Sequence, residues 1–463
     1  MKTLQFLTAL VFLVSLQFSR PVFGQMYYDD GRLICCGSSV AALSANAAFV
    51  NPAGLGGATE ITQSLNLLQP GFTAYGNSIK RKDALKFLFS NEEMTDSTKG
   101  SILGNMANNG QGNFLFDGNV NMNWIAYALI HPKYGGITFN LTDKIAGRTN
   151  LNPETTDLLL NGNEPDSESP DLPQTPSVQM SKGFGLGNSD IFYHHVREAN
   201  LAYGREIVAT ENFKLRAGAT ITRIWGIGHL DIQVQDSVVT GTSSFADPYN
   251  INYGALDSVL GSFSKNLFKT AGHGTAYSFG LQLGYKKLNV GVTAAHVGAI
   301  KWKHKSNMTT DGSESADSLN YEGISSYNFS SQTDGIYQLF GFQPDQAFSG
   351  KSNGKLRLNA DYRIIDQLSV FSDVLVFTHK KAGRKQPNNY LAGLSYQLIP
   401  DKFILTAGAQ YNRDIKLRYP VGIAFSIGKS AFLSISTGDV KTLISKKADP
   451  YSSLSVSLIG VAF

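Results

Sequence analysis

Apolar and polar residues alternate with a period of two through most of the chain after about residue 60. In Leu356–Ile364 the apolar side chains share one face of an extended segment, and the polar side chains share the other. Tyr277–Tyr285, Phe213–Thr222, Phe403–Tyr411 and Val421–Ile427 repeat this pattern. The alternation predicts β-strands with one apolar face.

The alternating segments are about 9–12 residues long, which is enough to cross a bilayer when a strand is tilted. A soluble β-sandwich would also alternate, but its strands average about 5–6 residues. Aromatic residues stand at the ends of several segments, as at Tyr277, Tyr285 and Tyr411, which is typical of residues at a membrane interface. The lengths therefore favour a membrane barrel over a sandwich.

Short and long connections follow one another along the chain. The short ones lie near Glu211-Asn212, Lys286-Lys287, Ile365-Asp366, Pro400-Asp401 and Gly428-Lys429, and the long polar ones cover about 150–176, 235–274 and 306–354. Outer-membrane barrels have tight periplasmic turns and large outer loops. The sequence predicts an all-β fold, a transmembrane antiparallel β-barrel of about fourteen strands.

The first 24 residues have the pattern of a signal peptide for export. Met1-Lys2-Thr3 is a short positive region, Leu4–Phe18 is mostly apolar, and a cleavage site precedes Gln25. After Gly24 no apolar run reaches the length of a spanning helix, which excludes a helical inner-membrane protein. We expect a signal peptide at 1–24 and a barrel at 60–463 in the cell outer membrane of a Gram-negative bacterium, with outer-membrane lipid as its surroundings.

Two segments interrupt the strand pattern. Residues 25–59 are rich in small residues and poor in alternation, so we expect an amino-terminal hatch, or plug, there. Residues 81–109 contain apolar residues at helical spacing, which predicts either a helical loop or a further part of the plug.

Composition narrows the function classes. The chain has 46 Gly, 20 Tyr and 16% charged residues, which suits a β-barrel better than a soluble enzyme. A formal charge of +4 without a basic, aromatic-rich run makes nucleic acid an improbable partner. Cys35-Cys36 fits two buried residues of the plug, with a strained disulfide as the alternative.

Catalytic and cofactor-binding signatures are absent from the sequence. His194-His195 is the only close histidine pair, and adjacent strand residues point to opposite faces, so one metal ion would not be held by both. We therefore expect no enzyme activity, no catalytic residues, no cofactor and no metal site.

The most specific motif is Asn51-Pro52-Ala53-Gly54, which follows a run of small residues and precedes the first expected strand. Asn-Pro starts a turn, and Ala and Gly allow close backbone contact. In this position the motif resembles the hatch of FadL-type outer-membrane barrels, a superfamily that includes the long-chain fatty-acid transporter and the PorV-like components of type IX secretion.

The resemblance implies a hatch-blocked barrel of about fourteen strands that takes up small hydrophobic compounds. In the transporters the compounds leave through a lateral opening at a kinked strand. The alternative is a PorV-like barrel that serves as a partner or shuttle for secreted proteins. The last strand, ending in Phe463, resembles the signal that the barrel-assembly machinery reads.

Three arginines, Arg216, Arg357 and Arg363, lie on expected polar faces and are candidate lumen charges. They would steer an anionic head group or, as we favour, pair with lumen carboxylates such as Asp361 and Asp373.

Overall fold

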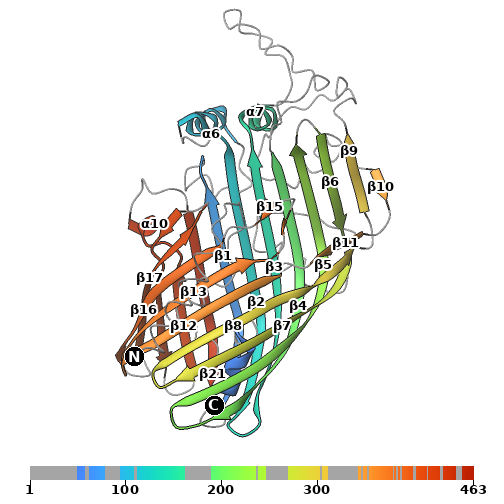
Figure 1. Ribbon diagram of the computed structural model, residues 1–463. Helices are drawn as coiled ribbons and strands as arrows, with labels where there is room; N and C mark the ends of the chain where they lie inside the picture. Colours follow the sequence, from blue (N-terminus) through green and yellow to red (C-terminus); the bar gives the residue numbers. More distant parts are fainter. Residues whose placement is uncertain are drawn as a thin grey trace, which may run out of the picture.

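The computed structural model describes a closed antiparallel β-barrel (Figure 1). Its described residues are 50–57, 62–78, 94–108, 112–161, 189–235, 238–246, 270–302, 305–310, 343–345, 348–351, 354–378, 380–381, 384–385, 388–399, 403–413, 416–427, 431–444 and 451–462. The expected signal peptide, most of the expected hatch, Cys35-Cys36 and Phe463 lie outside these ranges.

Fourteen strands form the ring, each paired antiparallel with its neighbours. In order they are β1 (Thr62–Gly76), β2 (Phe114–His131), β3 (Gly135–Leu151), β4 (Asp190–Ala209), β5 (Phe213–Gln235), β7 (Gly272–Tyr285), β8 (Leu288–Trp302), β12 (Lys355–Ile365), β13 (Leu368–Phe377), β16 (Asn389–Ile399), β17 (Phe403–Asn412), β19 (Val421–Ile427), β20 (Ala431–Thr437) and β21 (Tyr451–Ala462). The predicted fold class and approximate strand number are confirmed.

The last strand closes the ring against the first. Ser64 of β1 is opposite Ala462 of β21, and Tyr75 is opposite Tyr451. This pairing leaves no free edge at the joint, which a barrel in lipid requires.

The two faces of the wall have opposite chemistry. Polar residues such as Asn66, Asn140 and Thr222 are buried on the lumenal face. Large apolar residues are exposed on the outer face, among them Ile137, Phe139, Leu201, Tyr203, Ile221, Tyr277, Phe279, Leu281, Leu394, Tyr396, Ile423 and Phe425. An apolar belt this extensive is typical of a membrane-spanning barrel. Among the described residues, no helix is long and apolar enough to span a membrane.

Several strands are longer than the predicted 9–12 residues. β4 has 20 residues and β5 has 23. Their ends carry the wall beyond the belt, where β5 pairs with β6 (Val238–Phe245) and β6 pairs with β9 (Lys305–Thr310). The lengths were underestimated because hydrogen bonding continues where the outward face no longer needs apolar residues.

Shorter strands complete the sheet: β10 (Gln343–Asp345), β11 (Phe348–Lys351) and β18 (Lys416–Arg418). β14 (Lys380–Lys381) and β15 (Arg384–Lys385) pair separately, and α10 (Lys441–Ile444) precedes β21. Two of the three segments expected to be long polar loops, 235–274 and 306–354, therefore contain further strands.

Two helices lie at the long-loop end of the barrel (Figure 1): α6 (Asp96–Asn108) and α7 (Pro153–Asn161). Met94, Ile102 and Met106 form a buried cluster with Leu160 of α7. The described part of the 81–109 insertion is thus a helical loop on this end, far along the strands from the hatch motif.

Candidate functional site

The Asn-Pro-Ala-Gly motif forms a short helix against the inner wall, η1 (Pro52–Gly56). Asn51 caps it: its Oδ1 accepts a hydrogen bond from the Ala53 N–H at 3.0 Å, and its Nδ2 donates to the Leu281 carbonyl of β7 at 3.1 Å. Pro52 fits the first helical position because no hydrogen bond is needed from its nitrogen. The cap therefore also anchors η1 to the wall.

Four glycines form the surface on which η1 lies. Gly136, Gly204, Gly218 and Gly280 are successive partners across β3, β4, β5 and β7, and we call them the glycine row. A Cβ would lie 2.0 Å from the Pro52 oxygen at Gly204, 2.4 Å from the Pro52 carbonyl carbon at Gly218, and 2.1 Å from Asn51 Oδ1 at Gly280. Any larger residue in the row would displace η1.

Leu55 fixes the other end of η1. Its side chain is fully buried in a cluster with Ala126, Ala128, Ile130 and Ala202. Burial of one leucine contributes about 1.5–3 kcal/mol. Small wall residues thus admit the backbone of η1, and one large side chain holds it in place.

Asn51→Ala removes both anchoring hydrogen bonds and is expected to weaken the seat of η1 by about 1 kcal/mol, the usual cost of losing a cap. Hydrogen exchange of peptides covering 50–57 should become about fivefold faster, while peptides of β2 and β3 keep their protection. Unchanged exchange at Ala53 would contradict the anchoring role.

A polar layer follows beside the glycine row. Asn66, Asn140, Asn200 and Thr222 are buried there, on strands β1, β3, β4 and β5. Asn200 Nδ2 donates to Asn140 Oδ1 at 2.7 Å, and Thr222 donates to Asn200 Oδ1. The lumen is therefore hydrophilic along this part of the wall.

Buried ion pairs are also part of the lumen. Lys144 Nζ is 2.7 Å from Glu198 Oε2, with 10% and 5% of the two side chains exposed. Further pairs include Arg148–Asp190 (3.5 Å), Arg357–Asp373 (2.7 Å) and Arg418–Asp439 (3.2 Å). Paired charges compensate each other for the water they lose on burial.

The three candidate lumen arginines have different surroundings. Arg357 is 3% exposed and forms the expected pair with Asp373. Arg216 is 3.4 Å from Glu206 near the short-turn end. Arg363 shares the strand face of Arg357, but it is exposed beside the β12–β13 turn. Alternation predicted the face of each residue but not its depth in the barrel.

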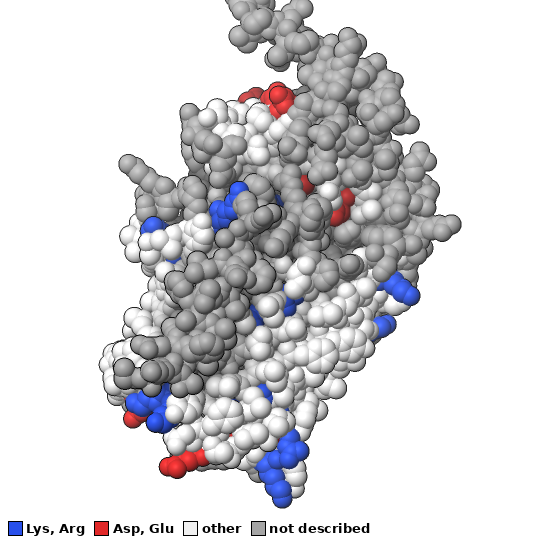
Figure 2. Space-filling model, in the orientation of Figure 1, with Lys and Arg blue, Asp and Glu red and all other residues white. Residues whose placement is uncertain are grey.

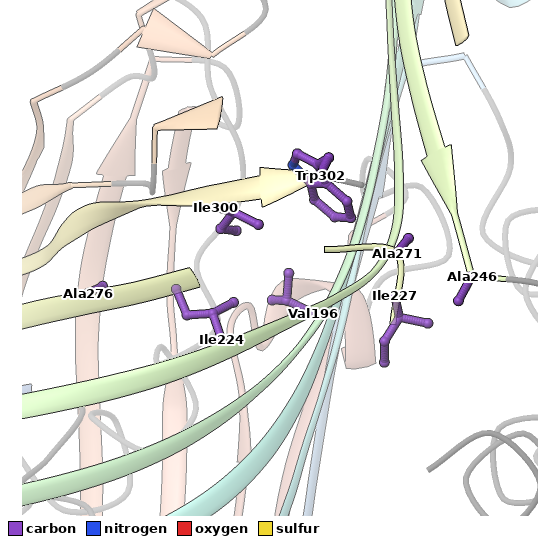
Figure 3. Packing of buried hydrophobic residues seen from close by; sticks show 8 residues of the cluster. All are labelled: Val196, Ile224, Ile227, Ala246, Ala271, Ala276, Ile300 and Trp302. Carbon is purple, nitrogen blue, oxygen red and sulfur yellow. The ribbon is translucent and has the colours of Figure 1, made fainter. Parts of the chain in front are cut away.

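An apolar group lies farther along the inner wall, and we call it the Trp302 cluster (Figure 3). Trp302 ends β8 and packs on two glycines, where a Cβ would lie 2.5 Å (Gly226) and 2.8 Å (Gly272) from its ring. The cluster members are Val196, Ile224, Ile227, Ala246, Ala271, Ala276, Ile300 and Trp302. They fill the fork at which β5 changes partner from β7 to β6.

Aromatic residues extend this cluster. The His229 ring stacks on Trp302 with centroids 5.2 Å apart, and His194 meets Trp302 edge-on at 5.8 Å. His195, the next residue, is on the opposite face of β4. Within the described ranges, no three His, Cys, Asp or Glu side chains form a group that could hold a metal ion.

The ladder between β1 and β21 is interrupted over three residues of β1. Leu67 is opposite Ile459 and Gly71 is opposite Ser455, but Leu68, Gln69 and Pro70 are not paired with β21. Leu68 has a left-handed backbone, with φ of 49°, and its side chain is 43% exposed. Pro70 has no N–H to donate. We call this interruption the β1–β21 seam.

Sequence reasoning missed the glycine row, the Trp302 cluster and the seam. Each glycine of the row lies in a different strand, so pairing alone brings them together. Pro70 was the visible signal for the seam, since proline within a strand marks a missing ladder bond.

A family model described as a family of unknown function, DUF5723, matches residues 54–434. The chain belongs to that family. No curated protein matches the sequence. The matched segment begins within η1 and covers the ring through most of β20.

The chain is similar to solved barrels at low identity. The toluene transporter TodX of Pseudomonas putida is 12% identical, with 96% of this chain and 98% of that chain covered and a TM-score of 0.43. A Pseudomonas aeruginosa FadL homologue is 13% identical, with the same coverage and a TM-score of 0.36. The translocator domain of the Neisseria meningitidis autotransporter NalP is 7% identical, with 93% and 99% covered and a TM-score of 0.35. FadL-family channels are thus among the structures to which this chain is similar, as the motif predicted.

Proposed function

We propose that this protein is a FadL-like outer-membrane channel for the uptake of small hydrophobic compounds, gated by η1. The observation that carries the proposal is the seat of η1 on the glycine row, inside the lumen near the short-turn end. The seat consists of two hydrogen bonds to or within the cap and one buried leucine. All five residues of η1 are buried, but η1 belongs to no strand ladder, so it can leave and return without breaking the hydrogen bonds of the wall.

Two features support hydrophobic cargo. The Trp302 cluster places buried apolar and aromatic side chains on the inner wall beyond the polar layer. The β1–β21 seam, with exposed Leu68, offers a point at which cargo can leave sideways into lipid. The polar layer and ion pairs between the barrel ends argue against a continuous apolar tunnel, so cargo would be small enough to pass them.

Leu55→Asp is expected to open the gate, because it places a charge in the apolar seat while leaving the wall unchanged. In Gram-negative cells displaying the protein in the outer membrane, uptake of a hydrophobic fluorescent naphthylamine should exceed that of cells lacking it. The L55D variant should raise this rate about 30-fold further, since losing about 2 kcal/mol of packing multiplies the population of the open state about 30-fold.

The controls separate gating from leakage. Gly147→Ala, at a position where a Cβ would meet its nearest neighbour only at 4.0 Å, should leave uptake at the wild-type rate. A hydrophilic chromogenic β-lactam measures general permeability in the same cells. Faster entry of the β-lactam alone would refute hydrophobic transport, and unchanged entry of both probes would refute gating by η1.

The alternative, a PorV-like secretion partner, remains a prediction. Its support is the long outer loops and the helical insertion at 81–109, which would offer a protein-binding surface. In the described part of that insertion, Ile102 and Met106 of α6 are already buried against α7 and the strand ends. That apolar face is therefore not available to a partner.

A further inference from the structure

Basic residues form a row on the outer face of the wall, at its long-loop side. Trp225 of β5 is the partner of His273 of β7, and His273 is the partner of Lys301 of β8. Arg223 is two residues from Trp225 on β5 and shares its outward face. Directly paired and diagonal side chains on adjacent strands are about 5–8 Å apart, so Arg223, His273 and Lys301 can act together. We call them the basic row.

The basic row is exposed and uncommitted. Arg223, His273 and Lys301 are all exposed, and among the described residues none of their side chains has a hydrogen-bond or ion-pair partner. Figure 2 shows Lys and Arg side chains standing out from the right-hand edge of the barrel, near the upper ends of β7 and β8. The row thus presents three cationic or protonatable groups to the outside of the barrel.

The acidic residue near the basic row, Asp143, already forms an ion pair. Arg197, the partner of Trp225 on β4, holds Asp143 through Nε–Oδ1 and Nη2–Oδ2 contacts of 2.7 and 2.9 Å. Trp124 Nε1 donates to the same carboxylate at 2.9 Å. Both charged side chains are about nine-tenths buried. The Asp143 carboxylate is thus paired with Arg197 and does not compensate the positive charge of the basic row.

The position of the basic row relative to the apolar belt identifies its surroundings. On each strand the basic residue lies on the long-loop side of an exposed apolar residue. Arg223 lies beyond Ile221 on β5, His273 beyond Tyr277 on β7, and Lys301 beyond Val297 on β8. From Tyr277 to Tyr285, both exposed, the strand spans about 20 Å across a membrane when tilted. The row therefore begins where hydrocarbon ends and head groups begin.

We propose that the basic row binds the phosphate groups of a phosphorylated glycolipid in the outer leaflet, of the lipid A type. Apolar side chains directly below it receive the acyl chains, and Trp225 lies at the interface where indoles are favoured. Inorganic phosphate has no apolar part that could contact the adjoining apolar surface. The proposal rests on the outer-membrane location in the proposed function and on the long loops facing outward, as the connection lengths predict, but it does not depend on gating.

Removing two charges should weaken lipid binding strongly. Each basic residue near an anionic surface contributes about fivefold in affinity, so R223Q/K301Q should lower affinity by about 25-fold. The full-length protein in detergent is titrated with bisphosphorylated lipid A while tryptophan fluorescence is followed. Dephosphorylated lipid A should bind the wild type and R223Q/K301Q equally weakly.

Three controls decide the outcome. K133Q/K286Q removes two exposed lysines from the short-turn end and should keep wild-type affinity, whereas R223K/K301R keeps the charges and most of the binding. Equal loss in R223Q/K301Q and K133Q/K286Q, or unchanged binding in R223Q/K301Q, overturns the proposal. Full competition by inorganic phosphate at matched phosphate concentration also overturns it, because it assigns the row to free phosphate. Failure of L55D to alter uptake leaves this result unaffected.

Discussion

Gly218→Val is expected to unseat η1 and hold the channel open. A Cβ at this position would lie 2.4 Å from the Pro52 carbonyl carbon and 2.6 Å from the Ala53 nitrogen, both backbone atoms that cannot turn aside. Overpacking of this kind costs about 1–3 kcal/mol, which raises the unseated population about 5- to 150-fold. Single-channel recordings in planar bilayers should show the variant open for a correspondingly larger fraction of time.

The matched control is Gly118→Ala, in a strand glycine whose Cβ would first meet the Phe116 ring at 3.4 Å. It should record like the wild type. A second route to the same effect is Gly204→Val, where the Pro52 oxygen is the obstacle. If neither valine variant changes the open fraction while both fold as barrels, η1 does not control conduction.

Asp373→Ala should produce the largest loss of stability. It leaves the Arg357 guanidinium, 3% exposed, without the carboxylate that lies 2.7 Å from its Nε. Breaking a buried pair at one partner costs about 3–5 kcal/mol because the remaining charge stays desolvated. Urea unfolding of the refolded barrel in detergent, followed by tryptophan fluorescence, measures the free energy of unfolding.

The double variant R357M/D373M tests the cause. Removing both charges and filling their space should recover most of the lost stability, since buried pairs replaced by apolar residues are often neutral. A double variant as unstable as D373A would mean that the carboxylate acts through other contacts rather than through Arg357.

Much of the barrel could be predicted from alternation alone. The segments at Phe213, Tyr277, Leu356 and Phe403 were correctly assigned because one face must meet lipid and the other the lumen. The upper halves of β4 and β5 were not, since outside the belt the outward face carries no apolar requirement. The alternation of apolar and polar residues thus predicts the membrane-spanning part of each strand but not its full length.

The Asn-Pro-Ala-Gly motif can be recognised in the sequence, whereas the glycine row that holds it cannot. Asn51 and Pro52 stand together in the sequence, and their turn follows from their chemistry. The glycine row joins residues as distant as Gly136 and Gly280, and only strand register aligns them. Register depends on bulges and turn lengths along the whole chain, which the sequence did not reveal. The same applies to the partner of Arg216, since Glu206 lies across the β4–β5 hairpin.

The joint between β1 and β21 has a consequence for biogenesis. Ser64 and Ala462 must meet across almost the whole length of the chain, so this ladder has the largest loop-closure entropy in the wall and forms last. Until then both strands are open edges that invite pairing with other chains. A half-made barrel would therefore need its two edges sheltered until the final segment arrives. A protein that shelters these two edges would therefore release them last, when the interrupted β1–β21 ladder forms.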